Sequence, residues 1–429
     1  MQPKNKNLLV NLSDDDLDEL ATLTHSGYNH KLDNKATTSG QINNYTKILK
    51  DTKKIAGVLR KKTKSTKFSF IDLFAGIGGF RLAGENSSGT CTFSCEKDKY
   101  ARISYYYNFG KIPFGDINTI TQVSQISKVP DHDVLCGGFP CQAFSISGKR
   151  LGFADSRGIL FYRIIDILKN KIERNKPVKI VFLENVKNLK KHGETEGQTL
   201  QIINNEFRGI GYTLSTIVLN SGFHGAATKR ERIYLIAVHK DSFPSEVEID
   251  KFNQALKSLG ESNPEGKSIS NYLESLNRSE ATKYSIPENR IMTSVSVLND
   301  LDKIAKKTLP LKPIQIGKIG KKGDPRKGRQ GERIYSIYGQ ATTFSANGGG
   351  LAAKTGAYLI DGIVRKLTPT ECAKIMGFTR GKTIMKTDEL IKIGVSESQL
   401  YKQFGNSVVV PTVQTIFKLI QEHFFPKKD

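Results

Sequence analysis

The sequence contains no tryptophan, only four methionines and only five cysteines among its 429 residues. The cysteines are odd in number and lack a disulfide-like spacing, which excludes a disulfide-stapled secreted domain and favours a reducing cytoplasm. No histidine lies near Cys91 and Cys95 to complete a tetrahedral set, and we therefore expect no metal site.

Long apolar runs are missing as well. No run approaches the roughly eighteen residues of a membrane span. No N-terminal segment combines a basic start with an apolar core and a cleavage site. The sequence therefore predicts a soluble, cytoplasmic protein.

Acidic residues are scarce beside basic ones, 42 against 65, which gives a formal net charge of +23 and a pI near 9.6. Such a balance indicates a polyanionic partner, most simply nucleic acid. A basic surface that only aids solubility is the alternative, and the motifs must decide between the two.

Residues 1–67 form a polar, basic N-terminal extension. Within it, "NLSDDDLDEL" offers Ser13 as the N-cap of one short helix with acids in its first turn. Residues 47–67 are strongly basic, which is typical of an arm or a solvated linker.

From Phe68 the pattern changes to short apolar runs that alternate with helix-period segments. The runs "FSFIDLF", "DVLCGGF", "VKIVFLENV", "YTLSTIVLN" and "RIYLIAV" are predicted strands. Residues 158–171 and 197–208 are predicted helices, the second closed by Gly209 as its C-cap. The alternation predicts an α/β fold with a doubly wound, mostly parallel sheet over residues 68–258.

Residues 259–402 are richer in Gly, Ser, Asn and Lys, with strand candidates at "ERIYSIYG" and "GAYLIDGIVRKL", and are expected to form a smaller, loop-rich domain. Residues 403–429 become apolar again at helical spacing and are expected to return to the first domain.

The stretch "FIDLFAGIGGFRLAG" predicts a strand, a turn at Gly76, Gly78 and Gly79, and a helix. Open parallel sheets bind ligands at this end of a strand, and Glu96, after "CTFSC", could accept hydrogen bonds from ribose hydroxyls. A plain strand-to-helix turn explains the glycines about as well. Their clustering suits S-adenosylmethionine, which has no phosphate, better than a dinucleotide.

Cys141 lies outside any apolar run, in the loop "GGFPCQAFSISG", whereas a core cysteine should lie within one. Glu184 ends the strand "VKIVFLE", and Arg230 and Arg232 enter another strand at period-two spacing. A helix cap and surface arginines are the ordinary alternatives. A thiol, a carboxylate and guanidiniums beside an adenosyl site are what alkylation of an unactivated pyrimidine carbon requires.

Six motifs occur in one order: "DLFAGIGGF", "GGFPCQAFS", "ENV", "KRERIY", "RKLTPTECAKIMGF" and "QFGNSVVVP". Over about residues 68–413 the chain resembles the DNA (cytosine-5)-methyltransferases of bacterial type II restriction-modification systems. The resemblance implies a Rossmann-like S-adenosylmethionine-dependent domain, a loop-rich target-recognition domain, and a bacterial or phage origin.

The resemblance also implies roles for individual residues. Cys141 resembles the nucleophile, Glu184 the carboxylate that activates the base, and Arg232, supported by Arg230, the group that holds the ring. The positions that match cofactor contacts are Phe74, Gly76, Ile77, Gly79, Glu96, Asp116, Ile117, Pro140, Leu160 and Asn406. Those that match DNA contacts are Ser145, Ser147, Gln330, Arg333 and Thr343.

The implied reaction methylates carbon 5 of a cytosine, swung out of duplex DNA, by a monomeric enzyme that protects host DNA from a partner restriction endonuclease. Two alternatives stay open: methylation of a tRNA cytosine, and operator binding through residues 1–67. The chain departs from the family at Lys97, where an aromatic residue is usual, and at Ala227 and Thr228, where Pro-Gln is usual.

Overall fold

The structure is a computed structural model that describes residues 9–24, 47–50, 56–60, 65–139, 159–193, 195–243, 246–261, 266–320, 329–348 and 350–426. The chain divides into two compact units. The first comprises Met1–Leu219, Glu231–Glu261 and Val413–Asp429, and the second comprises Asn220–Arg230 and Ser262–Thr412. The domain boundaries predicted after residues 67, 258 and 402 stay a prediction.

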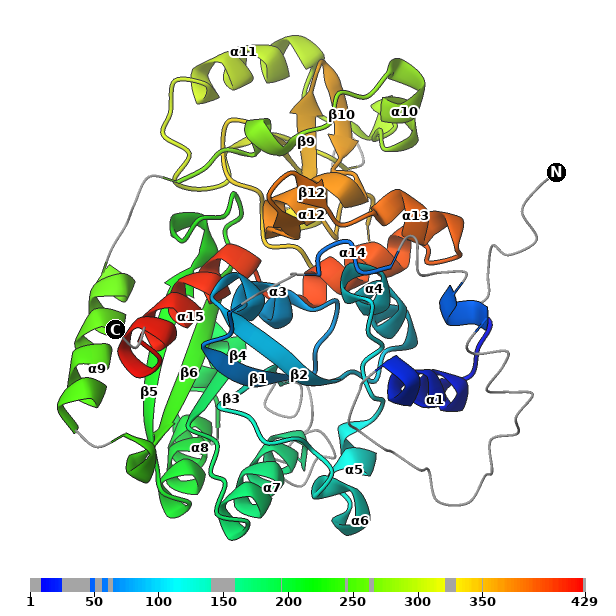
Figure 1. Ribbon diagram of the computed structural model, residues 1–429. Helices are drawn as coiled ribbons and strands as arrows, with labels where there is room; N and C mark the ends of the chain where they lie inside the picture. The colour runs from blue at the N-terminus through cyan, green and yellow to red at the C-terminus, as the bar shows by residue number, and fades with distance from the viewer. Residues whose placement is uncertain are drawn as a thin grey trace. The chain divides into compact units, whose positions relative to one another are not determined.

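A six-stranded sheet forms the centre of the first unit (Figure 1). Its strands are β1 (Phe68–Leu73), β2 (Gly89–Cys95), β3 (Val134–Gly138), β4 (Ile180–Val186), β5 (Tyr212–Asn220) and β6 (Glu231–His239), in the order β2-β1-β3-β4-β6-β5. Strands β1 to β4 are parallel, and β6 runs antiparallel to β4. The five predicted strands and the predicted α/β fold are confirmed.

Helices lie on both faces of this sheet and beside its edges (Figure 1). They are α1 (Asp14–Thr24), α3 (Gly79–Asn86), α4 (Lys99–Phe109), α5 (Ile117–Ile120), α6 (Val123–Ile126), α7 (Ile159–Glu173), α8 (Gln198–Gly209), α9 (Glu246–Glu261) and α15 (Val410–Phe424). On one face, Phe417 of α15 stacks on Phe68 and meets Phe182 edge-on. On the other face, Phe161 of α7 meets Phe207 of α8. None of the described helices is long and apolar enough to cross a membrane.

Two cap predictions had different outcomes. Ser13 caps α1 as predicted, since its hydroxyl accepts from the backbone N–H of Asp16 at 3.1 Å. The prediction that Gly209 ends α8 was wrong, because the helix includes Gly209 and is capped by Ile210. The left-handed residue is Gly211, with φ of +85°.

The second unit contains a smaller sheet with the strand order β10-β9-β8-β7. Its strands are β7 (Gln315–Lys318), β8 (Arg333–Ser336), β9 (Ala357–Ile360) and β10 (Ile363–Lys366), and the last three confirm the predicted strand segments. A short hairpin adds β11 (Thr379–Arg380) and β12 (Thr383–Ile384). The helices are α10 (Arg278–Lys283), α11 (Val295–Ala305), α12 (Pro369–Met376), α13 (Thr387–Lys392) and α14 (Glu397–Asn406).

Candidate active site

The glycine turn after β1 leaves room for a ligand at one position and for a neighbouring helix at another. Gly76 has φ of +54°, and a Cβ added there would meet no atom within 4 Å. Gly78 has φ of +88°, and its added Cβ would lie 2.1 Å from the ring of Phe109. Phe74 also adopts a positive φ of 54°, which is uncommon for a non-glycine residue. Gly79 begins α3.

Glu96 is hydrogen-bonded to this turn. Its Oε2 accepts from the Gly76 N–H at 2.8 Å, and its Oε1 accepts from the Asp98 N–H at 2.7 Å. Burial raises the pKa of Glu96, and these hydrogen bonds oppose the rise. The carboxylate is therefore fixed beside the turn.

A buried asparagine, which sequence reasoning missed, also supports the turn. The side chain of Ile77 is buried, and the Ile77 backbone carbonyl accepts from Asn108 Nδ2 at 3.0 Å. Asn108 lies in α4, within a helical run of aromatic residues that gave no signal of this contact.

Asp116 lies beside Glu96 because the segment before it pairs with the end of β2. The Glu96 N–H donates to the carbonyl of Phe114 at 2.8 Å. Asp116 caps α5, and its Oδ2 accepts from Lys97 Nζ at 2.8 Å. Burial raises the pKa of Asp116, but hydrogen bonds from Lys97 and Asn118 outweigh it and leave the pKa below its ordinary value.

The two remaining described cofactor candidates of the first unit lie near α5. Ile117, the first residue of α5, is buried. Leu160 is half-buried in the first turn of α7, the helix that contacts α5. Pro140, Cys141, Ser145 and Ser147 lie outside the described residues.

Glu184 and Arg232 form an ion pair at the carboxyl end of β4. Arg232 Nε lies 2.9 Å from Glu184 Oε1, and the two side chains are 16% and 11% exposed. A Cβ added to Gly138, at the end of β3, would lie 3.5 Å from Glu184 Oε2. The carboxylate therefore lies beside the strand that leads into the Cys141 loop.

Asn185 fixes the chain at the same point. Its Nδ2 donates to the carbonyl of Phe139 at 3.1 Å, and its side chain is buried. The sequence pattern did not identify Asn185 as a site residue, although its position directly after Glu184 was an available signal.

The other four cysteines, Cys91, Cys95, Cys136 and Cys372, are free and buried. Burial raises the pKa of Cys91 to about 12 and raises the pKa values of the other three well above the ordinary value. None of these four supplies a thiolate near neutral pH.

The second unit brings four predicted residues together from distant parts of the sequence. Gln330 Nε2 donates to the carbonyl of Thr343 at 2.6 Å, and the Thr343 hydroxyl donates to the carbonyl of Lys229. Arg230 is buried, and its Nη1 and Nη2 donate to the carbonyls of Phe344 and Gly405 at 3.2 and 3.0 Å. Asn406 follows Gly405 and is exposed.

Arg230 and Arg232 were expected to act together. In the structure β6 begins at Glu231, so Arg230 precedes the strand, and its guanidinium donors bind the backbone. Arg333 begins β8 opposite Lys318. Thr228 is one of the positions where the chain departs from the family pattern. Its buried hydroxyl donates to the carbonyl of Thr342 at 3.1 Å, which ties the loop before β6 to residues 341–342.

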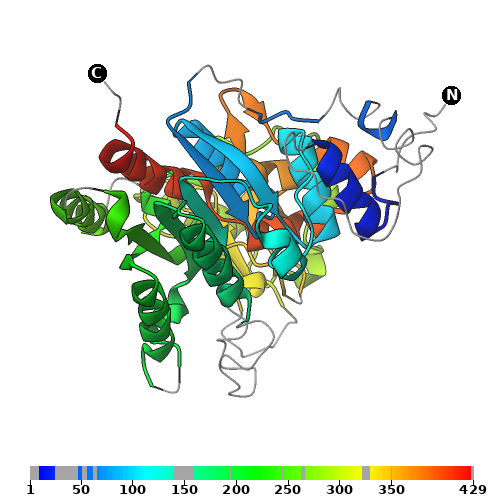
Figure 2. The same cartoon turned by 60° about the horizontal axis from the view of Figure 1, so that its bottom comes forward.

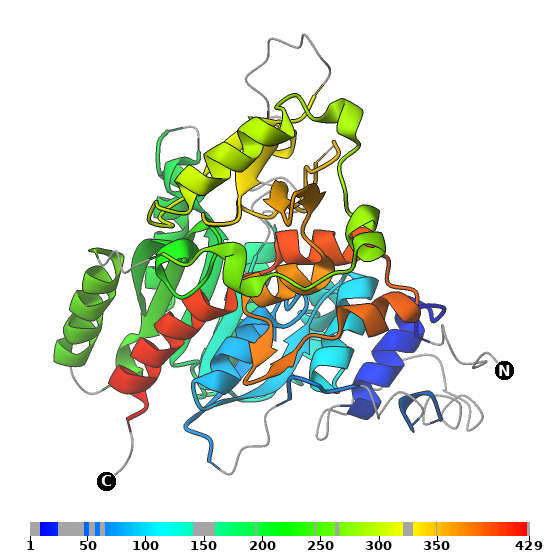
Figure 3. The same cartoon turned by 90° about the horizontal axis from the view of Figure 1, so that it is seen from above.

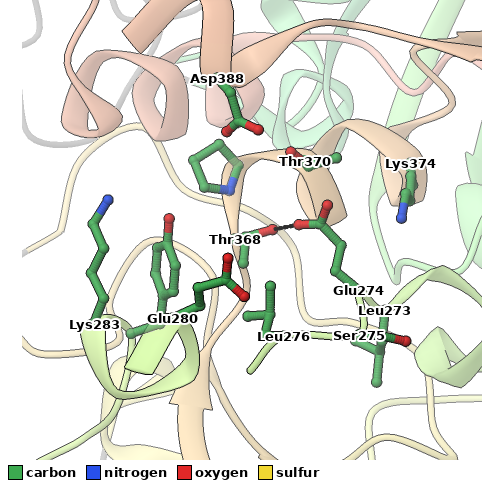
Figure 4. Close-up of a pocket in the computed structure, with 12 residues that line it drawn as sticks. Leu273, Glu274, Ser275, Leu276, Glu280, Lys283, Thr368, Thr370, Lys374 and Asp388 are labelled. Atoms are coloured by element: carbon green, nitrogen blue, oxygen red, sulfur yellow. Dashed lines mark hydrogen bonds between the residues drawn. The ribbon is translucent and has the colours of Figure 1, made fainter. Parts of the chain in front are cut away.

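The second unit contains a pocket of 640 Å³. Figure 4 shows the side chains that line it. It is lined by carboxylates, among them Glu274 and Asp388, and by the lysines Lys283 and Lys374. Glu274 Oε2 accepts from the Thr368 hydroxyl at 2.5 Å. Among the described residues, none of the predicted site residues lines this pocket.

Comparisons with known proteins place this geometry in a family. Residues 68–422 match the family model of C-5 cytosine-specific DNA methylases. The chain belongs to this family. The methylase is 43% identical over 362 residues to type II methyltransferase M.HhaI of Haemophilus parahaemolyticus, covering 83% of this chain and 95% of that protein. It is 32% identical to M1.ScrFI of Lactococcus lactis subsp. cremoris over 98% of this chain and 94% of that protein.

The fold comparison agrees with the architecture of the methylase. The crystal structure of S. pombe Dnmt2 methyltransferase matches with a TM-score of 0.58 and 21% identity, covering 83% of this chain and 98% of that one. The expected family, fold and enzyme class are confirmed: the methylase is a DNA cytosine-5 methyltransferase.

Proposed function

We propose that the methylase uses S-adenosylmethionine to methylate carbon 5 of a cytosine swung out of a short duplex DNA sequence, with Cys141 as nucleophile. The observation that carries the proposal is the Glu184–Arg232 ion pair beside Gly138, three residues before Cys141. Because the other four cysteines are buried with raised pKa values, Cys141 is the one candidate left for the thiolate.

The residues of the first unit fit S-adenosylmethionine. The open space at Gly76 admits a ligand close to the backbone, and each Glu96 oxygen has a second lone pair for a ribose hydroxyl. Asp116 offers an acceptor for the amine of adenine. When bound, S-adenosylmethionine supplies an electrophilic methyl group.

Carbon 5 of cytosine is a weak nucleophile until carbon 6 gains a substituent. The Cys141 thiolate would bond to carbon 6, and the electron pair of the 5,6 double bond would then bond carbon 5 to the methyl group as the bond between that methyl group and the cofactor sulfur breaks, with S-adenosylhomocysteine as the leaving group. Loss of the carbon 5 proton to water and cleavage of the bond between the Cys141 sulfur and carbon 6 would restore the double bond and the thiolate.

Glu184 and Arg232 lower the barrier of the first step. The Glu184 carboxyl group shares a proton with ring nitrogen 3 of the base, and its other oxygen accepts from the exocyclic amine. Arg232 orients Glu184 and binds the carbonyl oxygen of the base. Neither face of a stacked cytosine is open to both the thiolate and the methyl donor, which is why the base must leave the stack.

The remaining parts of the proposal concern DNA and the cell. Gln330, Arg333 and Thr343, with Ser145 and Ser147, contact the duplex, and the basic residues near them bind phosphates. The enzyme acts as a monomer in a bacterial cytoplasm and protects host DNA from a partner endonuclease. The net charge of +23 supports a polyanionic substrate.

The first experiment measures transfer of labelled methyl from S-adenosylmethionine to unmethylated duplex DNA, with Cys141→Ser beside the parent, and maps the product by bisulfite sequencing. We expect methylcytosine at one short repeated motif and none with the variant. A duplex carrying 5-fluorocytosine at that motif should trap the covalent complex, because carbon 5 then has no proton to lose.

Three outcomes would contradict the proposal at different points. Full activity of Cys141→Ser would exclude Cys141 as the nucleophile. Methyl transfer to tRNA in preference to duplex DNA would show that tRNA, not duplex DNA, is the substrate. DNA from expressing cells that lacks methylcytosine at the motif, despite activity in vitro, excludes the protective role.

A further inference from the structure

Helix α1 of the N-terminal extension is packed against α4 in the first unit. Leu17, Leu20 and Ala21 on one side of α1 are fully buried, and Figures 2 and 3 both show α1 beside α4. Burial of this apolar face fixes α1 to the first unit.

Asp18 of α1 is linked through an arginine to the loop that leads to Asp116. The Arg102 guanidinium of α4 is 1% exposed, and its Nη2 donates to Asp18 Oδ1 at 2.5 Å. Its Nε donates to the carbonyl of Pro113 at 3.0 Å. Without Asp18 a buried positive charge would lose its closest carboxylate, so the contact with Pro113 depends on α1.

Two further contacts join α1 to the same loop. The Thr24 hydroxyl accepts from the Ile112 N–H at 3.1 Å. The Asp18 carboxylate lies 2.9 Å from the position that a Cβ on Gly115 would occupy. From the other side, Cys95 Sγ donates to the carbonyl of Gly115 at 2.8 Å. The loop is therefore held between α1 and β2.

We propose that α1 is a positioning element of the adenosyl end of the cofactor site: Asp18, through Arg102 and Gly115, fixes residues 112–117 and so places Asp116 and Ile117 against the adenine. The inference rests on the proposed function, in which Asp116 accepts from the adenine amine, and on the resemblance, in which Ile117 matches a cofactor contact. Operator binding by α1 is disfavoured, because acids fill its first turn and would repel DNA phosphates.

The test compares Asp18→Asn with Asp15→Asn in the full-length chain. Both variants remove one negative charge from the first two turns of α1, and Asp15 is exposed. Calorimetric titration with S-adenosylhomocysteine and with adenosine should show Kd raised about tenfold for Asp18→Asn, equivalent to about 1.4 kcal/mol, and unchanged for Asp15→Asn. The KM for S-adenosylmethionine should rise with it, whereas the KM for DNA and kcat should not.

Thr24→Val, which keeps the side-chain shape and removes the acceptor for Ile112, gives a second reading if Asp18→Asn folds poorly. We expect a smaller rise in Kd, about threefold. If α1 serves only the stability of the fold, both substitutions would lower Tm. The Kd values for S-adenosylhomocysteine and adenosine, measured well below Tm, would then equal those of the parent, and that result overturns the inference. A parent chain that binds neither ligand would instead overturn the proposed cofactor.

Discussion

Arg232 and Glu184 lie on the same face of two antiparallel strands. Arg232 is the direct partner of Val186, and Glu184 is two residues from Val186 on β4, so both side chains point the same way and meet at 2.9 Å. The carboxylate that would activate the base is therefore oriented before any base enters.

This arrangement predicts the effect of Glu184→Gln. The amide keeps the size of the side chain but cannot share a proton with ring nitrogen 3, so kcat for methyl transfer should fall about 10²- to 10⁴-fold. Binding of S-adenosylhomocysteine should not change. Glu231→Gln is the matched control, because Glu231 is in an exposed pair with Lys187, and its kcat should stay within about twofold. A single-turnover rate of methyl transfer by Glu184→Gln within threefold of the parent's would show that Glu184 does not take part in the reaction.

Lys97 Nζ donates to Asp116 Oδ2 at 2.8 Å, and an adenine amine would have to compete with it. Lys97→Met should therefore lower the Kd for S-adenosylhomocysteine about twofold to fivefold at low salt, since the exposed pair contributes about 0.2–1 kcal/mol. The difference from the parent should shrink in high salt. Lys99→Met, which removes the same charge two residues along the chain, should leave Kd unchanged. Weaker binding by Lys97→Met would mean that Lys97 contacts the ligand itself.

The sequence allowed prediction of those parts of the site that depend on local pattern. Residues near the end of an apolar run lie at the carboxyl edge of the sheet, which is why Gly76, Glu96 and Glu184 could be located from the sequence. The hydrogen bond from the Gly76 N–H to Glu96 and the position of Glu184 beside Gly138 agree with that argument. The prediction that Glu184 ends its strand was wrong, because β4 continues to Val186.

Contacts that depend on packing between distant segments could not be predicted. Asp18 and Arg102 are 84 residues apart, and Arg230 reaches a carbonyl 175 residues away. Gly209 shows the limit within one helix: a glycine near a helix end favours a C-cap, but the left-handed turn was placed two residues later, at Gly211.

His132 predicts how stability depends on pH. Burial lowers the pKa of His132 to about 4, and its Nδ1 lies 2.8 Å from the carbonyl of Pro130. In the unfolded chain His132 binds a proton near pH 6.5, whereas in the folded chain it binds one only near pH 4. The contribution of neutral His132 to the free energy of unfolding is therefore fully present above pH 6.5 and is lost as the pH falls toward 4. His132→Asn can donate to the same carbonyl but does not titrate. Its free energy of unfolding should therefore fall by about 3 kcal/mol less than that of the parent between pH 6.5 and about pH 4. Urea denaturation at the two pH values measures these losses. If the parent and the variant lost the same free energy of unfolding between them, the result would contradict a buried neutral imidazole.

In the second unit, Arg365 and Glu371 form a buried pair. The two guanidinium Nη atoms lie 2.8 and 2.7 Å from the two carboxylate oxygens, with both side chains at most 2% exposed. Glu371 also accepts from the backbone N–H groups of Thr368 and Glu274 at 2.8 and 3.0 Å. The carboxylate therefore satisfies one buried charge and two backbone donors at once.

Glu371→Leu should destabilise the protein by about 3–5 kcal/mol, because it leaves the Arg365 charge uncompensated in the interior. Adding Arg365→Met removes that charge but leaves the N–H groups of Thr368 and Glu274 without their acceptor, at about 1–3 kcal/mol each, so the double variant should recover only part of the loss. Glu389→Gln, in an exposed pair with Lys392, should change stability by less than about 0.5 kcal/mol. Urea denaturation followed by circular dichroism measures all three. Full recovery of stability in the double variant would show that the two backbone N–H groups are hydrogen-bonded to water instead. The Glu371 carboxylate would then stabilise the protein only through its pair with Arg365.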